Sequence, residues 1–345
     1  MPDPLVRSRV RVAAGLAAAL LLPPGVLGPA VPGRAASAAT GSVTTAVRDA
    51  RTGEPARACV SLVPLDPDRL TAVYVGESQL GRSAGCTDDR GRIAVSGVEP
   101  GRYRLFAQPY ETGRYGRQWV GGRGGTGQRH QAWVVSVAAG TTTVAPRVRL
   151  DPPGQISGVV SDAATGSPVA GVQVAVVPFV PHPKYSPDVP ITDDTGRYTV
   201  TGLGPYDWAL RFSGARIATQ WSGGVGNPLL ARAVRVRPGG TATLHQALRR
   251  PTAVRGSIRA DELATYSTVV AFDAVTGDVA GAVDVGPSYD LPVLPGQRVR
   301  LRCDCATGPG RWHPGGSGFT DAAPVRVGRA PVTVDFDLTA DADGW

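Results

Sequence analysis

Apolar residues recur along this chain in short segments, several of which alternate with polar residues. The segments 158–162 (GVVSD) and 172–177 (VQVAVV) are examples, and clusters of Asp, Gly, Ser and Pro such as 162–168 separate them. Alternation over four to eight residues between turn clusters is typical of strands in antiparallel sheets. The sequence contains no amphipathic stretch of helical length with the 3.6-residue period. The pattern therefore predicts an all-β chain.

The strand pattern is repeated. The hexapeptide TDDRGR at 87–92 returns as TDDTGR at 192–197, and in both places an alternating strand, a turn and another strand follow. A weaker third copy covers 289–301, without the Asp-Gly turn. A repeat of about one hundred residues indicates tandem domains, not a solenoid of short repeats. We therefore predict three modules, called modules 1, 2 and 3, which cover residues 41–150, 154–249 and 251–340.

The first 38 residues have the pattern of a targeting segment. Three arginines within the first eleven residues precede the apolar run 12–22, two prolines end that run, and Ala36-Ser37-Ala38 offers a cleavage site. This order is typical of a secretory signal peptide, and the run is too short for a permanent membrane span. The sequence predicts a signal peptide over 1–38 and a secreted mature protein that is not attached to the membrane after signal cleavage.

Module 2 carries a recognisable motif order, G-x-V-x-D-x-x-T-G-x-P followed by T-D-x-x-G-x-Y-x-V-x-G-L. The positions that carry it are Gly158, Thr165, Gly166, Pro168, Gly196, Tyr198, Gly202 and Leu203. This order resembles the carboxypeptidase regulatory-like domains, best over 154–249, well over 41–150 and weakly over 251–340. The resemblance implies three Ig-like, prealbumin-like β-sandwiches, related to collagen-adhesin B-type repeats and to starch-binding-like modules. It implies a structural, adhesive or carbohydrate-associated role, because such modules carry no chemistry themselves.

Net charge argues against a nucleic-acid partner. The full chain carries +8, and loss of residues 1–38 removes four arginines and one aspartate, which leaves +5. That charge is mild for about three hundred residues, and the basic residues are scattered along the alternating segments. We therefore expect the basic residues to lie on a solvated surface and the protein not to bind nucleic acid.

The sequence offers no catalytic or cofactor motif. The four histidines have no Glu or His within four residues, as a zinc peptidase would require; they are His130, His182, His245 and His313. Phe319 stands where a nucleophile elbow needs its second glycine. Aspartates at 88–89, 193–194 and 341–343 raise calcium as an alternative, but none matches the twelve-residue calcium loop, and turn formation explains the first two pairs. We predict no enzyme activity, no cofactor and no metal.

Four cysteines in an exported chain predict disulfides. Three pairings are open, and we favour Cys59–Cys86 within module 1 and Cys303–Cys305 within module 3, because each then joins residues of one module. An extended strand would hold the Cα atoms of Cys303 and Cys305 near 6.7 Å, at the limit of disulfide geometry, so this pair requires a bend at Asp304.

Three tryptophans occupy equivalent places before a Gly- or Pro-containing turn: Trp119, Trp221 and Trp312. They are either core residues or platforms on which sugar rings stack. The sequence favours a non-catalytic secreted protein with a structural, adhesive or extracellular binding role. The alternative is a carbohydrate-binding accessory protein, and an α-amylase or carboxypeptidase ranks third. Candidate partners are a polysaccharide or a protein of the extracellular matrix or cell surface.

Overall fold

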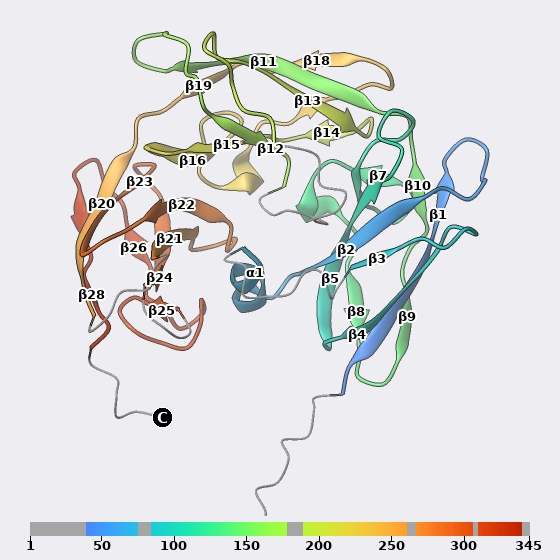
Figure 1. The fold of residues 1–345 in the computed structure, drawn as a ribbon, viewed down its shortest axis with the longest axis horizontal. Coiled ribbons are helices and arrows are strands. Elements are labelled where there is room, and N and C mark those ends of the chain that lie inside the picture. Colours follow the sequence, from blue (N-terminus) through green and yellow to red (C-terminus); the bar gives the residue numbers. More distant parts are fainter. Residues whose placement is uncertain (1–38, 75–83, 178–188, 261–266, 306–309, 340–345) are drawn as a thin grey trace, which may run out of the picture. The chain divides into compact units, whose positions relative to one another are not determined.

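The computed structural model describes residues 39–74, 84–177, 189–260, 267–305 and 310–339, and the predicted signal peptide lies outside them. The described residues form an all-β structure with one α-helix, α1 (Pro67–Tyr74), and two 3₁₀ turns, η1 (Arg129–Gln131) and η2 (Pro228–Leu230) (Figure 1). None of the helices in these ranges is long and apolar enough to cross a membrane.

Every sheet takes all its strands from a single predicted module. The first sheet of module 1 holds β1 (Gly41–Asp49), β4 (Arg92–Val98), β9 (Thr142–Val144) and β10 (Val148–Leu150). Its second sheet holds β2 (Ala58–Pro64), β3 (Ala84–Cys86), β5 (Gly101–Pro109), β6 (Gln118–Val120), β7 (Gly125–Thr126) and β8 (Val135–Val137). Two sheets built from strands with alternating apolar and polar residues bury their apolar faces between them, which is the sandwich arrangement.

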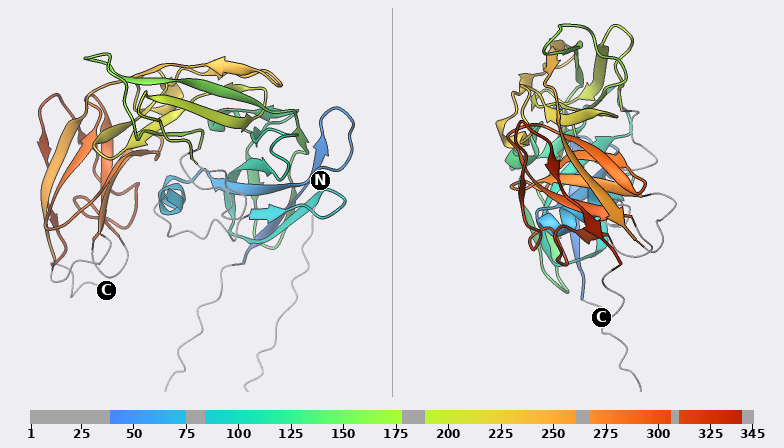
Figure 2. Two further views of the ribbon diagram at one scale, coloured as in Figure 1. Left: turned by 45° about the horizontal axis from the view of Figure 1, so that its top comes forward. Right: turned by 90° about the vertical axis from the view of Figure 1, so that its left-hand side faces the viewer.

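Modules 2 and 3 are built in the same way. In module 2 the first sheet holds β11 (Gly154–Asp162), β13 (Arg197–Leu203), β18 (Thr241–Thr243) and β19 (Gln246–Leu248). The others hold β12 (Gln173–Ala175), β15 (Arg211–Gly214) and β16 (Ile217–Trp221), and the pair β14 (Asp207–Trp208) and β17 (Val234–Arg235). β11, β13 and β18 run side by side in Figures 1 and 2.

Module 3 keeps this strand order although its sequence pattern is weak. Its first sheet holds β20 (Thr252–Arg259), β23 (Ser288–Val293), β27 (Val332–Thr333) and β28 (Phe336–Asp337). Its second holds β21 (Thr268–Asp273), β22 (Val279–Asp284), β24 (Arg298–Asp304), β25 (Arg311–Trp312) and β26 (Val325–Arg326). In all three modules the first strand lies between one antiparallel neighbour and two short parallel segments from the end of the module.

A glycine and a tyrosine fix this parallel pairing in module 2. Gly158 of β11 faces the carbonyl of Leu244 so closely that a Cβ atom would collide with the carbonyl oxygen. Tyr198, opposite Gly158 in register, donates its hydroxyl proton to the same carbonyl at 2.6 Å. Module 3 repeats the arrangement with Gly256, Tyr289 and Val334.

Module 1 reaches the same pairing with different side chains. Thr45 stands opposite Ile93 in register, where module 2 has Gly158 opposite Tyr198. The Thr45 hydroxyl donates to the carbonyl of Pro146 at 2.8 Å. In module 1 the hydroxyl group that bonds a carbonyl of the parallel segment thus belongs to the first strand. In module 2 it belongs to Tyr198 on the neighbouring strand.

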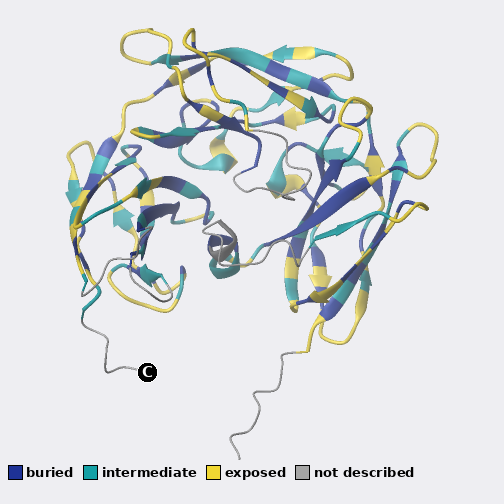
Figure 3. Cartoon of the chain, in the orientation of Figure 1, coloured by how far each residue is buried: buried dark blue, intermediate teal, exposed yellow. Residues whose placement is uncertain are grey.

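Burial follows the alternation in the sequence. The nine residues of β1 alternate between buried and half-buried without a break, and Figure 3 shows buried positions along the strands and exposed ones in the turns. One core cluster joins residues of module 1, among them Phe106 and Trp119, to residues of module 2 such as Val174, Trp208 and Phe212. Modules 1 and 2 therefore share a continuous apolar core.

Aspartate side chains close the turns. The Asp193 carboxylate accepts hydrogen bonds from the backbone N–H groups of Thr195 and Arg197, both at 2.9 Å, and Gly196 has a φ of 72°. Asp88 does the same in module 1, where Gly91 has a φ of 67°. Only glycine adopts this left-handed conformation readily, so the Asp-Gly pattern indicates a turn.

Acid is expected to weaken module 1 through Asp49. Its carboxylate is buried and accepts the N–H groups of Thr52 at 3.0 Å and Arg51 at 2.8 Å and the Tyr115 hydroxyl at 2.9 Å. The Thr52 and Arg51 N–H groups hold the pKa of Asp49 below its usual 3.8. A lowered folded-state pKa contributes stability above the unfolded value, and that stability is lost as the pH falls below about 4.

The melting temperature of Asp49→Asn, measured at pH 7 and pH 3, tests this expectation. The variant should melt below the unaltered protein at pH 7 and lose less on acidification. An equal acid-induced loss in both proteins would show that Asp49 contributes nothing to the pH dependence.

Candidate binding surfaces

The structure buries all three tryptophans that the repeat singled out. Trp119, Trp221 and Trp312 are 1%, 6% and 5% exposed. Trp119 packs edge-on against Phe106 with ring centroids 5.1 Å apart, and Trp312 packs against Phe319 at 5.9 Å. The hypothesis that these rings are solvent-facing sugar platforms therefore disagrees with their burial, and the core alternative agrees with it. A large apolar ring at a strand end is more stable inside a sandwich than in water.

A small cavity lies between two of these rings. Trp119 and Trp221 line it together with Leu229 and the ion pair of Arg129 and Asp278, whose Nη2 and Oδ2 atoms are 2.8 Å apart. Its volume is about 40 Å³. That space accommodates one or a few water molecules and is far smaller than a sugar ring. The cavity is therefore not a carbohydrate site.

Polar groups join module 1 to module 2. The Tyr206 hydroxyl lies 2.8 Å from Gln118 Oε1 and 2.6 Å from Asp151 Oδ2. The Arg117 side chain donates to the carbonyls of Thr201 and Gly202. Burial lowers the pKa of the Arg117 guanidinium to about 10, which keeps it charged at neutral pH. A charge held among carbonyl oxygens at a junction fixes the orientation of the two partners.

Module 3 also contacts module 1. The carboxylate of Asp68, at the start of α1, accepts from Thr320 N at 3.2 Å and from Thr320 Oγ1 at 3.0 Å. The pair of half-buried Arg129 and buried Asp278 is a second link between these two modules. Modules 1 and 3 are therefore in direct side-chain contact although module 2 lies between them in the sequence.

The structure pairs the cysteines within modules. Cys59 and Cys86 stand opposite each other in the register of β2 and β3 and form a disulfide. Cys303 and Cys305 form the second, with Cα atoms 5.3 Å apart. The separation is shorter than in an extended strand because β24 ends at Asp304, between the two cysteines.

A fourth tryptophan, which the repeat does not indicate, is exposed. Trp133 follows η1 and is 54% exposed. Its backbone N–H donates to the carbonyl of Val120 at 2.9 Å, which fixes the start of the side chain. At the matching place after η2, module 2 has Arg232. Because Trp133 has no aromatic counterpart in module 2, a search for repeated aromatic residues misses it.

Three arginines surround a surface hollow next to Trp133. Arg123, Arg147 and Arg149 line this hollow of about 510 Å³ together with Gly122 and Pro146. All three arginines are exposed, and none forms an ion pair with a carboxylate of the described residues. We call Trp133, Gly122 and these three arginines the tryptophan–arginine surface. It combines an exposed aromatic ring with uncompensated positive charge.

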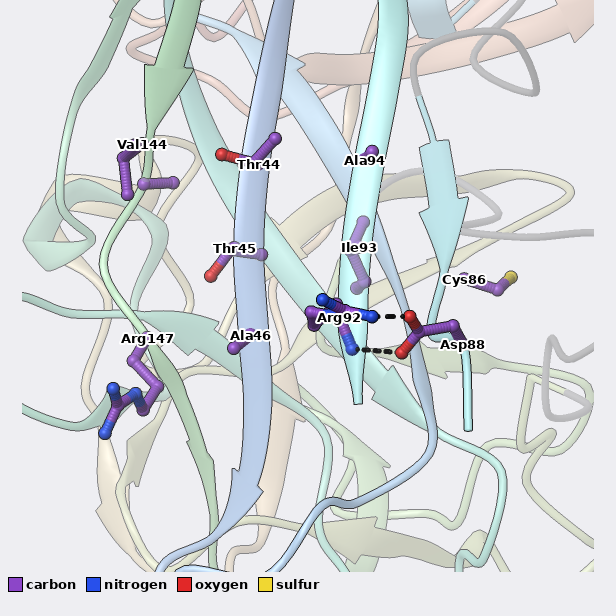
Figure 4. Close-up of a pocket in the computed structure, with 11 residues that line it drawn as sticks. Thr44, Thr45, Ala46, Cys86, Asp88, Arg92, Ile93, Ala94, Val144 and Arg147 are labelled. Carbon is purple, nitrogen blue, oxygen red and sulfur yellow. Dashed lines mark hydrogen bonds and ion pairs between the residues drawn. The ribbon is translucent and has the colours of Figure 1, made fainter. Parts of the chain in front are cut away.

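A second hollow adjoins the first, since Arg147 lines both. Figure 4 shows that short side chains of β1 and β4, among them Thr44 and Ala94, form its floor. Arg147 lies on one side of β1 and Arg92 on the other, where the Arg92 Nε atom meets Asp88 Oδ2 at 3.2 Å. The positive charge of Arg92 is thus compensated, and that of Arg147 is not.

The aspartate pairs form turns in this structure. Within the described ranges no three His, Cys, Asp or Glu side chains gather as metal ligands would. Asp341 and Asp343 lie outside those ranges, as does His182. The hydrogen bonds of Asp88 and Asp193 to their own turns account for the aspartate that begins each of the two repeated Asp-Asp pairs.

Comparison with solved structures gives distant matches. The chain is 10% identical to the Bacillus anthracis TIE protein, with 87% of this chain and 51% of that chain covered and a TM-score of 0.23. It is 14% identical to the minor pilin of Streptococcus agalactiae, over 61% of this chain and 96% of that chain, with a TM-score of 0.25. It is 11% identical to the major pilin subunit of Bacillus cereus, over 87% of this chain and 99% of that chain, with a TM-score of 0.19. TM-scores this low do not imply a common overall arrangement.

Comparison with curated proteins finds no match. A family model does match, over residues 155–249, which is module 2 almost from end to end. The glycine and tyrosine that fix its first strand lie inside this match. Residues 155–249 thus match the model of the carboxypeptidase regulatory-like domain, the family that the sequence pattern resembles.

Proposed function

We propose that the chain is an exported, non-catalytic protein of three β-sandwich modules, 41–150, 154–249 and 251–340, with a structural and binding role outside the cell. The observation that carries the proposal is the way the modules are joined. A shared core and the bonds of Arg117 and Tyr206 connect modules 1 and 2, and Asp68 and Asp278 connect modules 1 and 3. Such contacts hold surface groups of one module in a fixed relation to the others.

Two further features support export. The Cys59–Cys86 disulfide fits an extracellular protein, because the cytosol keeps thiols reduced. The order of arginines, apolar run and small residues in 1–38 is that of a signal peptide. The regulatory-like family match supports a binding or structural module, because fold membership by itself brings no catalytic groups.

Export is tested by expressing the full chain in a bacterium with an active secretion pathway and sequencing the N-terminus of the protein in the medium. We expect a mature protein that lacks residues 1–38. A matched chain in which Leu16 and Leu20 of the apolar run are replaced by arginine should stay in the cells, because the run would no longer be apolar enough for the secretion machinery. A full-length protein that stays in the cytosol in both cases would overturn the proposal.

A further inference from the structure

We propose that the tryptophan–arginine surface of module 1 binds a polysaccharide that carries carboxylate groups, such as a uronic-acid polymer. This inference rests on the proposed extracellular binding role and names the chemistry of the ligand. It replaces the three buried tryptophans as the carbohydrate site by one exposed tryptophan and its charged neighbours.

Gly122 lets the six-membered ring of the Trp133 indole approach the backbone closely. A Cβ atom at Gly122 would stand 3.0 Å from Cε3 and 3.2 Å from Cζ3 of Trp133, closer than side chains normally approach. A side chain at this position would therefore push the ring away from the backbone by a few tenths of an ångström. The ring is thereby supported from the protein side while more than half of the side chain stays exposed. A supported, exposed indole is suited to stack on the apolar face of a sugar ring.

The arginines next to Trp133 bring positive charge without compensation. Arg147 and Arg149 lie on the same side of their segment, because the intervening Val148 is buried. Arg48 stands directly opposite Arg149 in the register of β1 and β10. The Arg48 guanidinium donates to the carbonyl of Arg90 at 2.6 Å, so it adds a further positive charge that no carboxylate of the described residues neutralises. The guanidinium group is also the side chain that fits a carboxylate with two parallel hydrogen bonds.

Charge is distributed unevenly over the modules. Module 1 contains fifteen arginines and nine carboxylates, whereas module 3 contains eight arginines and ten carboxylates. The net charges are therefore +6 and −2. An acidic polymer would be drawn towards module 1 and away from module 3, which favours encounter at the tryptophan–arginine surface.

The observations favour a polysaccharide over a nucleic acid. Single-stranded nucleic acids are bound by several aromatic rings in succession along a basic groove. Trp133 is the only tryptophan exposed by more than half among the described residues. The adjoining hollow in Figure 4 continues with Thr44 and Ala94 and ends at an arginine that Asp88 already neutralises. The uncompensated positive charge is thus confined to a surface about as long as a few sugar units. It does not continue as a long basic groove.

Isothermal titration of the secreted protein with oligogalacturonate tests the inference, with maltohexaose as the neutral probe and a single-stranded DNA oligonucleotide as the second polyanion. We expect binding of oligogalacturonate, no measurable binding of maltohexaose, and at least about tenfold weaker binding for Trp133→Ala and for Arg147→Gln with Arg149→Gln. Arg149→Lys should also weaken binding, because lysine keeps the charge but loses the planar fork. The matched control is Arg326→Gln on module 3. Arg326 is also exposed, and its replacement should leave the affinity for oligogalacturonate unchanged.

Three outcomes would overturn the inference. Equal affinity for maltohexaose would show that charge does not select the ligand. Equal affinity for DNA that is insensitive to Trp133→Ala would show unspecific attraction of polyanions. A folded, exported protein that does not bind oligogalacturonate would remove the ligand class while leaving the proposed function intact, since that function fails only when the chain is not exported. Circular dichroism of each variant verifies that it is folded.

Discussion

Replacing Trp119 by alanine is expected to lower the free energy of unfolding by about 3–5 kcal/mol, the usual cost of removing a buried aromatic side chain. Trp119 is 1% exposed, and its ring packs edge-on against Phe106. The ring also belongs to the core cluster that joins modules 1 and 2. We therefore expect the unfolding transition of both modules to move, measured by urea denaturation and far-UV circular dichroism.

Trp133→Ala is the matched control, since it removes the same side chain from the same module at a position that is 54% exposed. Its expected cost is within about 1 kcal/mol, as for most surface substitutions. Trp119→Ala should thus lower the free energy of unfolding much more than Trp133→Ala does. Trp133→Ala should instead weaken the binding of oligogalacturonate. If the two variants were equally stable, Trp119 would not have the core role that its burial indicates.

The two disulfides are expected to differ strongly in their contribution to stability. Cys59 and Cys86 are 27 residues apart, whereas Cys303 and Cys305 are separated by two. A crosslink stabilises mainly by restricting the unfolded chain, and the effect grows with the length of the closed loop. Replacing Cys59 and Cys86 by alanine should therefore cost about 3–4 kcal/mol, and replacing Cys303 and Cys305 about 1–2 kcal/mol.

Urea denaturation of the two double variants measures this difference, and non-reducing peptide mapping of the unaltered protein verifies the pairs. Each double variant serves as the control for the other, because both remove two sulfur atoms. A larger loss from the Cys303 and Cys305 double variant would mean that folded-state packing of these two buried residues, not loop length, sets the contribution. A peptide joining Cys59 to a late cysteine would contradict the pairing itself.

The Asp-x-x-Thr-Gly pattern illustrates how far local sequence determines structure. It occurs at 49–53, 162–166 and 273–277, and in each case the aspartate accepts two backbone N–H groups and the glycine has a φ between 69° and 76°. In modules 1 and 2 this turn follows the first strand, but in module 3 it connects β21 to β22. The motif specifies a turn because its hydrogen bonds are local, and it says nothing of the turn's place in the fold.

The sequence by itself determined the all-β class, the Asp-Gly turns, and the match of residues 155–249 to a family model. These follow from contacts between near neighbours and from the alternation of one buried and one exposed face, which can be counted along the chain. Exposure of a single large side chain cannot be counted in this way. Trp119 and Trp133 lie only fourteen positions apart in the same module, yet one is buried and the other exposed.

Tertiary structure decided that difference. Trp119 is covered because module 2 packs against module 1, and Trp133 stays exposed above Gly122 beside arginines from two separate segments of the chain. Likewise, the links from Asp68 to Thr320 and from Arg129 to Asp278 join residues 252 and 149 positions apart. Such pairs have no period or spacing in the sequence, because they depend on how whole modules meet, and only the folded chain brings them together.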